Sequence, residues 1–241
     1  MMRIRKKIVR WLRDNLRQSR CRGIALGLSG GIDSACVAAL AKEAVGADKL
    51  LALILPCHSQ LRDLKDARLL VNNLKINTKT VDLTGIHDHL LKILPKANRM
   101  AVANLKPRLR MLVLYYFANK LNYLVCGTGN KSEIKVGYFT KHGDGATDLL
   151  PLGDLLKSQV KQLAEELKIP QRIIDKAPTA GLWPGQTDEG ELGITYPELD
   201  DILERVENKK RQIASADKVN KVKQMINRSA HKRQGPRICR I

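Results

Sequence analysis

The sequence predicts an α/β fold, a doubly wound parallel sheet with helices on both faces. Short apolar runs of strand length alternate with segments of helical periodicity along the first half of the chain. Parallel strands require a crossover connection, which is usually a helix. With 241 residues, of which 44% are hydrophobic, the chain is long enough to bury a substantial core. We therefore expect a single domain over residues 1–241.

The expected elements follow one another in regular alternation. Apolar residues at Ile8, Trp11, Leu12 and Leu16 recur at helical spacing and predict an amphipathic helix that starts at Ile4. Strands are expected at 24–28, 50–55, 78–83 and 123–126, and helices at 35–43, 63–74, 106–121, 155–167, 197–206 and 216–229. Glycine-rich turns follow the first and fourth strands, and ligands bind beyond the carboxyl ends of such strands, so both turns should face one site.

The net charge of +19 favours anionic partners, which include nucleic acid, membrane surfaces and phosphate-bearing substrates. Basic residues crowd 1–22 and 208–240, whereas 187–207 is acidic, so no basic stripe across one face is evident. Aromatic residues make up only 4%, and no RNA- or DNA-binding motif is present. We expect no nucleic-acid partner, and a solvated basic surface that draws in anionic substrates.

Cysteine usage and the terminal segment indicate a cytoplasmic enzyme. The five cysteines are odd in number and form no C-x-x-C pair, so they suggest reduced, mostly buried thiols and neither a disulfide framework nor a zinc site. Arg10 and Arg13 interrupt the apolar residues of the N-terminus, which is therefore no signal peptide. The apolar run 111–118 is too short to span a bilayer, and we expect no membrane association.

The segment Ser29-Gly30-Gly31-Ile32-Asp33-Ser34 has the composition of a phosphate-binding loop. Glycines let backbone N–H groups approach anionic oxygens, and the helix that follows adds positive potential at its N-terminus. No lysine follows in the G-K-[ST] position, so this is not a Walker loop. Asp33 supplies a hard carboxylate suited to Mg²⁺. A plain Gly-Gly turn capped by Asp and Ser is the alternative interpretation.

This loop is similar to the S-G-G-x-D-S pyrophosphatase loop. Enzymes with that loop transfer AMP from ATP to a carboxylate or carbonyl oxygen and release pyrophosphate. They include asparagine, argininosuccinate and GMP synthetases, tRNA-modifying enzymes and NAD synthetases. The loop by itself therefore indicates only this superfamily, and the choice among its members depends on residues farther along the chain.

Several downstream segments closely resemble the ammonia-dependent catalytic domain of NAD synthetase. The most specific is Gly137-Tyr138-Phe139-Thr140-Lys141-His142-Gly143-Asp144-Gly145, and the others are 126–133, 151–154, 176–183 and 185–189. The resemblance runs from residue 3 to residue 237. It implies an adenine nucleotide alpha hydrolase-like, Rossmann-like fold. Within it, 1–22 would be an N-terminal helix, 23–130 the ATP-binding core, and 131–241 the substrate-binding loops, flap and C-terminal helices.

The resemblance also implies a reaction and a set of site residues. Nicotinate adenine dinucleotide (deamido-NAD) would be adenylated by ATP and then amidated by ammonia, giving NAD, AMP and pyrophosphate. Asp33 and Glu133 would hold Mg²⁺; a surface acid or helix cap is the alternative for Glu133. The implied ATP-binding residues are Gly27, Leu28, Ser29, Gly30, Gly31, Ile32, Asp33, Ser34, Thr128, Lys157 and Thr179. Those implied for deamido-NAD are Arg108, Lys141, Asp148, His231 and Lys232.

Catalytic roles are expected for Asp33 and Lys157, and either Asp144 or Asp188 is a candidate to deprotonate ammonium. Lys157 would neutralise charge on the phosphates and the leaving pyrophosphate. Residues 179–191, which include Trp183, are expected to form a mobile flap that shields the adenylate from water. Ile54 stands where some family members carry an arginine near the adenine, so adenine recognition is left unassigned.

No segment before the loop is long enough for a glutamine-hydrolysing domain, so free ammonia or a separate glutaminase would supply nitrogen. The family forms homodimers, and the apolar face of helix 106–121 is the candidate contact unless it is simply core. A tRNA-modifying adenylating enzyme is the runner-up, but the C-x-x-C or RNA-binding extension expected of it is absent. An inactive binding module conflicts with the joint presence of Asp33, Glu133, Lys157 and Thr179.

Overall fold

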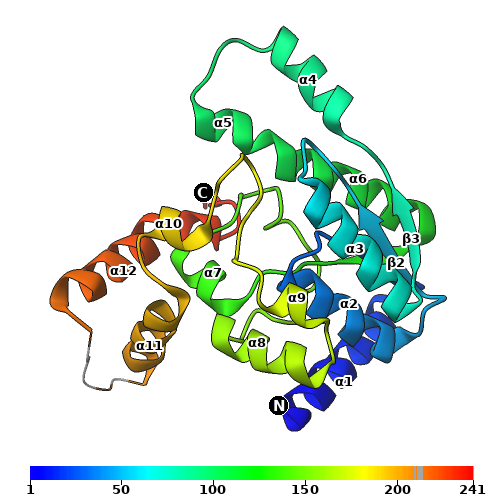
Figure 1. Ribbon diagram of the computed structural model, residues 1–241, viewed down its shortest axis with the longest axis horizontal. Coiled ribbons are helices and arrows are strands. Elements are labelled where there is room, and N and C mark those ends of the chain that lie inside the picture. The colour runs from blue at the N-terminus through cyan, green and yellow to red at the C-terminus, as the bar shows by residue number, and fades with distance from the viewer. Residues whose placement is uncertain (209, 211–213, 241) are drawn as a thin grey trace.

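The computed structural model describes residues 1–208, 210 and 214–240 (Figure 1). Its strands are β1 (Gly23–Gly27), β2 (Leu50–Ile54), β3 (Asn77–Thr80) and β4 (Tyr123–Cys126). The helices of the first half are α1 (Met2–Ser19), α2 (Ile32–Val45), α3 (Leu61–Leu74), α4 (Thr84–Ile93), α5 (Arg99–Ala103) and α6 (Leu105–Leu121). Those of the second half are α7 (Lys131–Val136), α8 (Lys157–Glu166), α9 (Gln171–Ile174), α10 (Asp188–Leu192), α11 (Tyr196–Glu207), α12 (Ala216–Arg228) and the 3₁₀ helix η1 (Ala230–Lys232).

The four strands form one parallel sheet in the order β3-β2-β1-β4. The chain runs outward from β1 through β2 to β3 and then crosses back to place β4 on the other side of β1. The strand order therefore reverses between β1 and β4, where such sheets bind ligands at the carboxyl ends of the strands. The predicted doubly wound parallel sheet is confirmed, and its switch point lies between the two glycine-rich turns.

Helices cover both faces of the sheet because successive side chains of a strand point to opposite sides. Ile24 and Leu26 of β1 face a core that they share with α1, α2 and α8. Ala25 of the same strand packs with Val125 and with Ala118 of α6 on the other face. Both faces of β1 are buried, which explains why the strand reads as an unbroken apolar run.

Most predicted elements are present, with ends shifted by a few residues. The prediction of β3 as 78–83 was wrong at its carboxyl end, because Asp82 Oδ1 accepts the Thr84 N–H at 2.9 Å and α4 begins there. In α1 the buried residues are Ile8, Val9 and Leu12, whereas Trp11 is 40% exposed, contrary to its placement in the apolar stripe.

Five short helices, α4, α5, α7, α9 and α10, were not predicted. The longest of them, α4, has Ile86, Leu90 and Ile93 at helical spacing, but it buries only His87 and leaves Ile86 and Ile93 exposed, so this apolar repeat does not pack into the core. The other four span six residues or fewer, which is less than two helical turns. Such segments are stabilised by the packing of their neighbours more than by their own sequence.

The C-terminal helices form a second apolar cluster beside the sheet layers (Figure 1). Leu192 of α10, Leu199 and Ile202 of α11, and Val222 of α12 are buried in it. The basic C-terminal segment 208–240 begins after α11, and its residues 209 and 211–213 lie outside the described part of the chain. No described helix combines the length and hydropathy needed to cross a bilayer. The cytoplasmic location expected from the sequence stays a prediction.

Candidate functional site

The expected phosphate loop connects β1 to α2 and is braced by its own serines. Ser34 Oγ lies 3.0 Å from Ser29 Oγ and donates to the Gly31 carbonyl at 3.0 Å, while the Ser29 N–H donates to Ser34 Oγ at 3.2 Å. Gly31 is the N-cap of α2 and has no side-chain capping bond. The loop therefore leads directly into the N-terminus of a helix, the arrangement that favours an anion.

Gly30 allows α3 to approach this loop closely. Its φ is +79°, and a Cβ there would come within 2.4 Å of the Asp63 carbonyl oxygen. Lys176 Nζ donates to the Gly30 carbonyl at 3.2 Å and to Asp66 Oδ2 at 3.1 Å. Asp66 is fully buried and also forms an ion pair with Arg172. Lys176, which follows α9, thus holds the loop, and its ammonium is fixed in turn by Asp66 of α3.

A lysine from the start of α8 joins the two glycine-rich turns. Lys157 Nζ lies 2.5 Å from Asp33 Oδ2 and 3.1 Å from Glu133 Oε1. Asn130, which follows β4, donates from Nδ2 to Asp33 Oδ1 at 2.9 Å. The structure therefore brings together Asp33, Glu133 and Lys157, which the sequence analysis placed in one site.

Glu133 serves the local helix as well as this site. In α7 it completes a capping box, in which Asn130 accepts the Glu133 N–H and Glu133 Oε2 accepts the Asn130 N–H. Its other oxygen, Oε1, faces Lys157 and accepts the Tyr196 hydroxyl at 3.3 Å. The helix-cap alternative is therefore correct for one oxygen, while the second oxygen points into the charged site.

A third carboxylate, Asp188, lies beside this pair. Tyr196 also contacts Asp188 Oδ2, at 3.1 Å, and Asp188 is 4% exposed. Its Oδ1 is buried and has no hydrogen-bond partner within the described part of the chain. We call Asp33, Glu133, Lys157, Asp188 and Tyr196 the Lys157 cluster. It holds three carboxylates and one ammonium.

The electrostatics of the cluster favour an additional cation. Burial, together with the charge of Asp33, raises the pKa of Glu133 to about 7 against the attraction of Lys157. Burial disfavours the charged form of Lys157, but the charges of Asp33 and Glu133 outweigh it and raise the pKa of this lysine. Burial likewise raises the pKa of Asp188. Three carboxylates here share one ammonium. Carboxylate oxygens are ligands that Mg²⁺ prefers, so Mg²⁺ is a suitable additional counter-ion.

The expected flap, residues 179–191, is held against α5 and α6. Lys106 Nζ, on a lysine that is 8% exposed, donates to the Leu182 carbonyl at 2.7 Å. The Arg99 guanidinium lies 4.1 Å from the centre of the Trp183 ring. Within the flap, Gln186 Oε1 accepts the Leu182 N–H at 2.7 Å. The last residues of the flap form the start of α10.

Four of the five residues expected to bind deamido-NAD lie along one run of contacts. Arg108 Nη2 donates to the Lys141 carbonyl at 3.3 Å, and Lys141 Nζ donates to the His231 carbonyl at 2.7 Å. Lys232 Nζ donates to the carbonyls of Gly137 and Phe139 at 2.7 and 2.8 Å. The signature segment that begins at Gly137 is therefore tied to the 3₁₀ helix η1 by lysine side chains.

The remaining candidates are placed separately. Asp148 accepts the Val125 N–H at 2.7 Å and the Tyr115 hydroxyl at 3.1 Å, so it braces β4 against α6. Thr128 lies within the glycine-rich turn after β4, and Thr179 Oγ1 accepts the Gly181 N–H at 3.1 Å where the flap begins. Asp144 is exposed and accepts the Thr140 N–H at 2.9 Å. Of the two candidate bases, only Asp188 belongs to the Lys157 cluster.

Several residues that support the site were not predicted from the sequence. Asn130 and Tyr196 contact its carboxylates, and Asp66 and Lys176 hold the phosphate loop. The spacing of Asn130 and Glu133 carries a capping-box signal that locates a helix start. Asp66 sits beside the apolar stripe of α3, and no local pattern marks an aspartate there as buried.

Comparisons with known proteins agree with this architecture. A family model described as NAD synthase matches residues 4–236. The chain is 47% identical over 238 residues to an NH₃-dependent NAD⁺ synthetase of Carboxydothermus hydrogenoformans, covering 97% of this chain and 95% of that protein. Among solved structures, an NMN synthetase from Francisella tularensis has a TM-score of 0.92 at 40% identity, covering 100% and 98% of the two chains.

An NH₃-dependent NAD synthetase from Campylobacter jejuni has a TM-score of 0.87 at 30% identity and covers 99% of both chains. These relatives match the chain over nearly its whole length, so the likeness includes the sheet, the flap and the C-terminal helices. With the family model covering almost the entire sequence, the chain belongs to the NAD synthase family.

Proposed function

We propose that this protein is an ammonia-dependent NAD synthetase, a ligase that converts the nicotinate carboxylate of deamido-NAD to an amide at the expense of ATP. The observation that carries the proposal is the Lys157 cluster, which stands at the switch point of the sheet beside the phosphate loop. Family membership and the names of the relatives support the same chemistry.

The first half-reaction activates the carboxylate. A nicotinate carboxylate oxygen attacks the α-phosphorus of ATP, the bond to the β-phosphate oxygen breaks, and pyrophosphate leaves. Backbone N–H groups of the loop 29–34 and the N-terminus of α2 bind the phosphates, and Lys157 stabilises the charge that grows on them. Asp33 and Glu133 would hold Mg²⁺, which when bound neutralises phosphate charge.

The second half-reaction forms the amide. Ammonia attacks the activated carbonyl carbon, AMP leaves, and the attacking nitrogen loses a proton. We assign the proton acceptor to Asp188 in preference to Asp144, because Asp188 is buried in the Lys157 cluster while Asp144 is exposed. Burial raises the pKa of Asp188, as it does that of Asp144, so both carboxylates are better bases than usual and the assignment rests on the position of Asp188 in the Lys157 cluster. The flap, held by Lys106 and Arg99, would exclude water from the adenylate.

Recognition of the nucleotide substrate is assigned to the run of contacts from Arg108 to Lys232. Arg108, Lys141, His231 and Lys232 provide cationic or hydrogen-bonding groups suited to a pyrophosphate and a carboxylate. Asp148, which lies beside β4, would either contact the substrate directly or hold the Tyr115 hydroxyl in place.

The similarity to an NMN synthetase supports a second candidate substrate, nicotinate mononucleotide. That molecule has the same reacting carboxylate but lacks the adenylate half of the dinucleotide. The chemistry at the Lys157 cluster would be the same for both, and the choice depends on the groups that meet the far half of the substrate.

We further propose a homodimer that uses ammonia, supplied free or by a separate glutaminase. Helix α6 is apolar on two sides: Val113 and Phe117 pack on the core, while Leu112 and Tyr116, one turn apart, are 62% and 61% exposed. Exposed large apolar groups on one helix face favour an interface. Light scattering on Leu112→Glu should report a monomer if this face forms the dimer, and an unchanged dimer would exclude it.

One assay tests the main proposal. The purified protein is incubated with ATP, Mg²⁺ and ammonium, together with either nicotinate adenine dinucleotide or nicotinate mononucleotide, and AMP and amide product are measured. The proposal requires stoichiometric AMP and NAD from the dinucleotide. A much higher kcat/KM for the mononucleotide would select the second candidate. AMP formation only on addition of tRNA, or none with any substrate, would refute both.

A further inference from the structure

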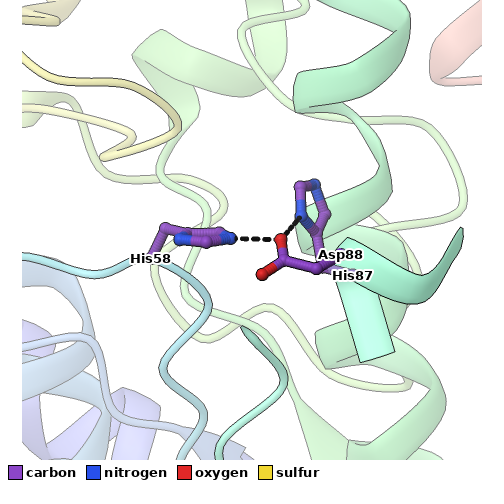
Figure 2. A group of neighbouring side chains, drawn as sticks. All are labelled: His58, His87 and Asp88. Carbon is purple, nitrogen blue, oxygen red and sulfur yellow. Dashed lines mark hydrogen bonds and ion pairs between the residues drawn. The ribbon is translucent and has the colours of Figure 1, made fainter. Parts of the chain in front are cut away.

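A second cluster of metal-binding side chains lies outside the Lys157 cluster. His58 belongs to the loop that follows β2, and His87 and Asp88 are neighbours on α4. Figure 2 shows the two imidazoles approaching the same carboxylate oxygen from different sides. His58 Nε2 lies 2.6 Å and His87 Nδ1 3.4 Å from Asp88 Oδ1. One potential ligand atom from each residue falls within 4.8 Å of the other two.

The chemistry of these donors differs from that of the Lys157 cluster. Two imidazole nitrogens and one carboxylate oxygen are ligands typical of Zn²⁺ and similar divalent transition metals, whereas Mg²⁺ prefers oxygen alone. Three protein ligands also leave one tetrahedral position for water or another ligand. The cysteines, whose spacing suggested no zinc site, take no part in this donor set.

The three side chains differ in burial: His87 is enclosed, whereas His58 and Asp88 are open to solvent. The His87 side chain is 4% exposed, while those of His58 and Asp88 are 44% and 46% exposed. An ion could therefore enter from solvent on the side of the exposed pair. Apart from its 3.4 Å contact with Asp88, the His87 ring makes no hydrogen bond to the described residues, and its Nε2 is buried without a partner. Hydrogen bonding thus gives little compensation for burying this imidazole.

The backbone directs His58 at the cluster at some conformational cost. Its φ is +52°, in the left-handed region that residues other than glycine rarely adopt. The His58 N–H donates to Thr84 Oγ1 at 3.2 Å, which ties this loop to the start of α4. The edge-on imidazoles have their ring centres 5.4 Å apart. A residue other than glycine keeps such a conformation where surrounding contacts fix it, as the bond to Thr84 does here.

The two distances from Asp88 to the imidazoles require only a small adjustment. Metal bonds of about 2.0–2.1 Å in a tetrahedral site place neighbouring ligand atoms roughly 3.3 Å apart. The His87 Nδ1–Asp88 Oδ1 separation of 3.4 Å already matches that spacing, and the His58–Asp88 pair at 2.6 Å would have to open by less than an ångström. Both side chains of that pair are exposed enough to make this movement.

We propose that His58, His87 and Asp88 form a binding site for a Zn²⁺-type divalent metal, separate from the site at Asp33 and Glu133. The bound ion would clamp the loop after β2 to α4. The same loop is held on its other side by Arg110, which donates to the Leu55 carbonyl at 3.0 Å and to Ser59 Oγ at 3.4 Å. Since this loop leaves the carboxyl end of β2, the metal would stiffen the edge of the sheet next to the phosphate loop.

The test uses the full chain, stripped with a chelator and kept in excess Mg²⁺ without nucleotide. Co²⁺ is titrated while the visible absorption of tetrahedral Co²⁺ is recorded, and Zn²⁺ binding is measured by calorimetry. We expect one equivalent of Co²⁺ with a tetrahedral spectrum, its displacement by Zn²⁺, and a higher melting temperature with Zn²⁺.

Variants locate the ion. His58→Gln and Asp88→Asn, both at exposed side chains, should weaken Zn²⁺ binding about tenfold or more, since each removes a metal ligand or its charge. His89→Gln changes the next residue of α4, which is exposed, and should leave the affinity unchanged. Glu133→Gln should also retain Zn²⁺ binding and so separate this site from the Lys157 cluster. Equal affinity in His58→Gln and the original protein, loss in Glu133→Gln, or no stoichiometric binding would overturn the proposal.

Discussion

Lys157 Nζ lies 2.5 Å from Asp33 Oδ2, although the two residues are 124 positions apart in the chain. The ion pair joins the start of α8 to the first turn of α2, directly after the phosphate loop. With Glu133 on the same ammonium, Lys157 serves both turns at the switch point of the sheet. The lysine therefore has a structural and a catalytic role, and these roles can be separated by substitution.

Lys157→Met should destabilise the protein more than Asp33→Asn does. Without the ammonium, the carboxylates of Asp33 and Glu133 remain half-buried with no cation, which typically costs about 3–5 kcal/mol. Asp33→Asn removes one of the two competing carboxylates and leaves Lys157 paired with Glu133, so its cost is smaller. Urea unfolding without nucleotide measures both. A larger loss for Asp33→Asn would contradict this account of the cluster.

Both variants should nevertheless lose activity, by at least roughly a hundredfold in kcat for AMP formation, because each removes a charge that acts on the phosphates. Pyrophosphate release measures the adenylation step separately from amidation. Full activity of Asp33→Asn would refute the metal and phosphate role assigned to this aspartate.

Gly30→Ala and Gly31→Ala should differ sharply, although the residues are adjacent. A Cβ at Gly30 would meet the Asp63 carbonyl at 2.4 Å with φ at +79°, and no flexible side chain can move to relieve that contact. Gly31 has φ −93°, and its Cβ would meet only Ser29 Oγ, at 3.3 Å. We expect Gly30→Ala to lower the free energy of unfolding by about 1–3 kcal/mol.

Gly31→Ala is the matched control and should unfold close to the original protein. Gly30→Ala should also raise KM for ATP, because the loop must shift away from α3 and from Lys176. Equal stability of the two variants would show that the approach of α3 does not require glycine at position 30.

Lys106→Met should uncouple adenylation from amide formation. The lysine is the side chain of α6 that holds the flap at the Leu182 carbonyl. A looser flap would admit water to the adenylate, so more than one AMP should form per amide product. The ratio of AMP to NAD, followed at limiting ammonium, measures this directly. Lys120→Met, on the same helix at an exposed position, should keep the ratio near one.

The same substitution should not destabilise the protein. Burial lowers the pKa of Lys106, so keeping it charged in the folded state has a cost. For a base whose folded pKa is depressed, that cost is present in full at pH values below the folded pKa, and it declines to zero as the pH rises from there to the pKa of the unfolded chain. Thermal unfolding of Lys106→Met at neutral pH should therefore match or exceed the original. A large loss would assign the lysine a structural role instead.

Thiol reactivity should divide the cysteines into two classes. Burial raises the pKa of Cys36, Cys57 and Cys126, which suppresses the reactive thiolate at neutral pH. Cys239 is exposed and Cys21 partly exposed. A thiol reagent should modify these two rapidly in the native protein and all five after denaturation. Fast native reaction of Cys36 or Cys126 would indicate local opening of the core.

The sequence by itself determined the sheet and the identity of its main loop. The strands at 50–54 and 123–126 are continuous local runs of apolar residues, because parallel strands are buried on both faces. Ser29 to Ser34 is likewise a contiguous motif, and the signature segment from Gly137 pointed to the same family that the comparisons report.

Only the tertiary structure decided which side chains meet. Asp66 lies under the phosphate loop, Tyr196 joins Asp188 to Glu133, and His58 meets Asp88 from another element. Helical and strand periodicity depend on neighbours a few residues away, so a single sequence reveals them. Contacts such as Lys157 with Asp33 depend on the simultaneous packing of α8, α2 and the sheet, and no local pattern contains that information.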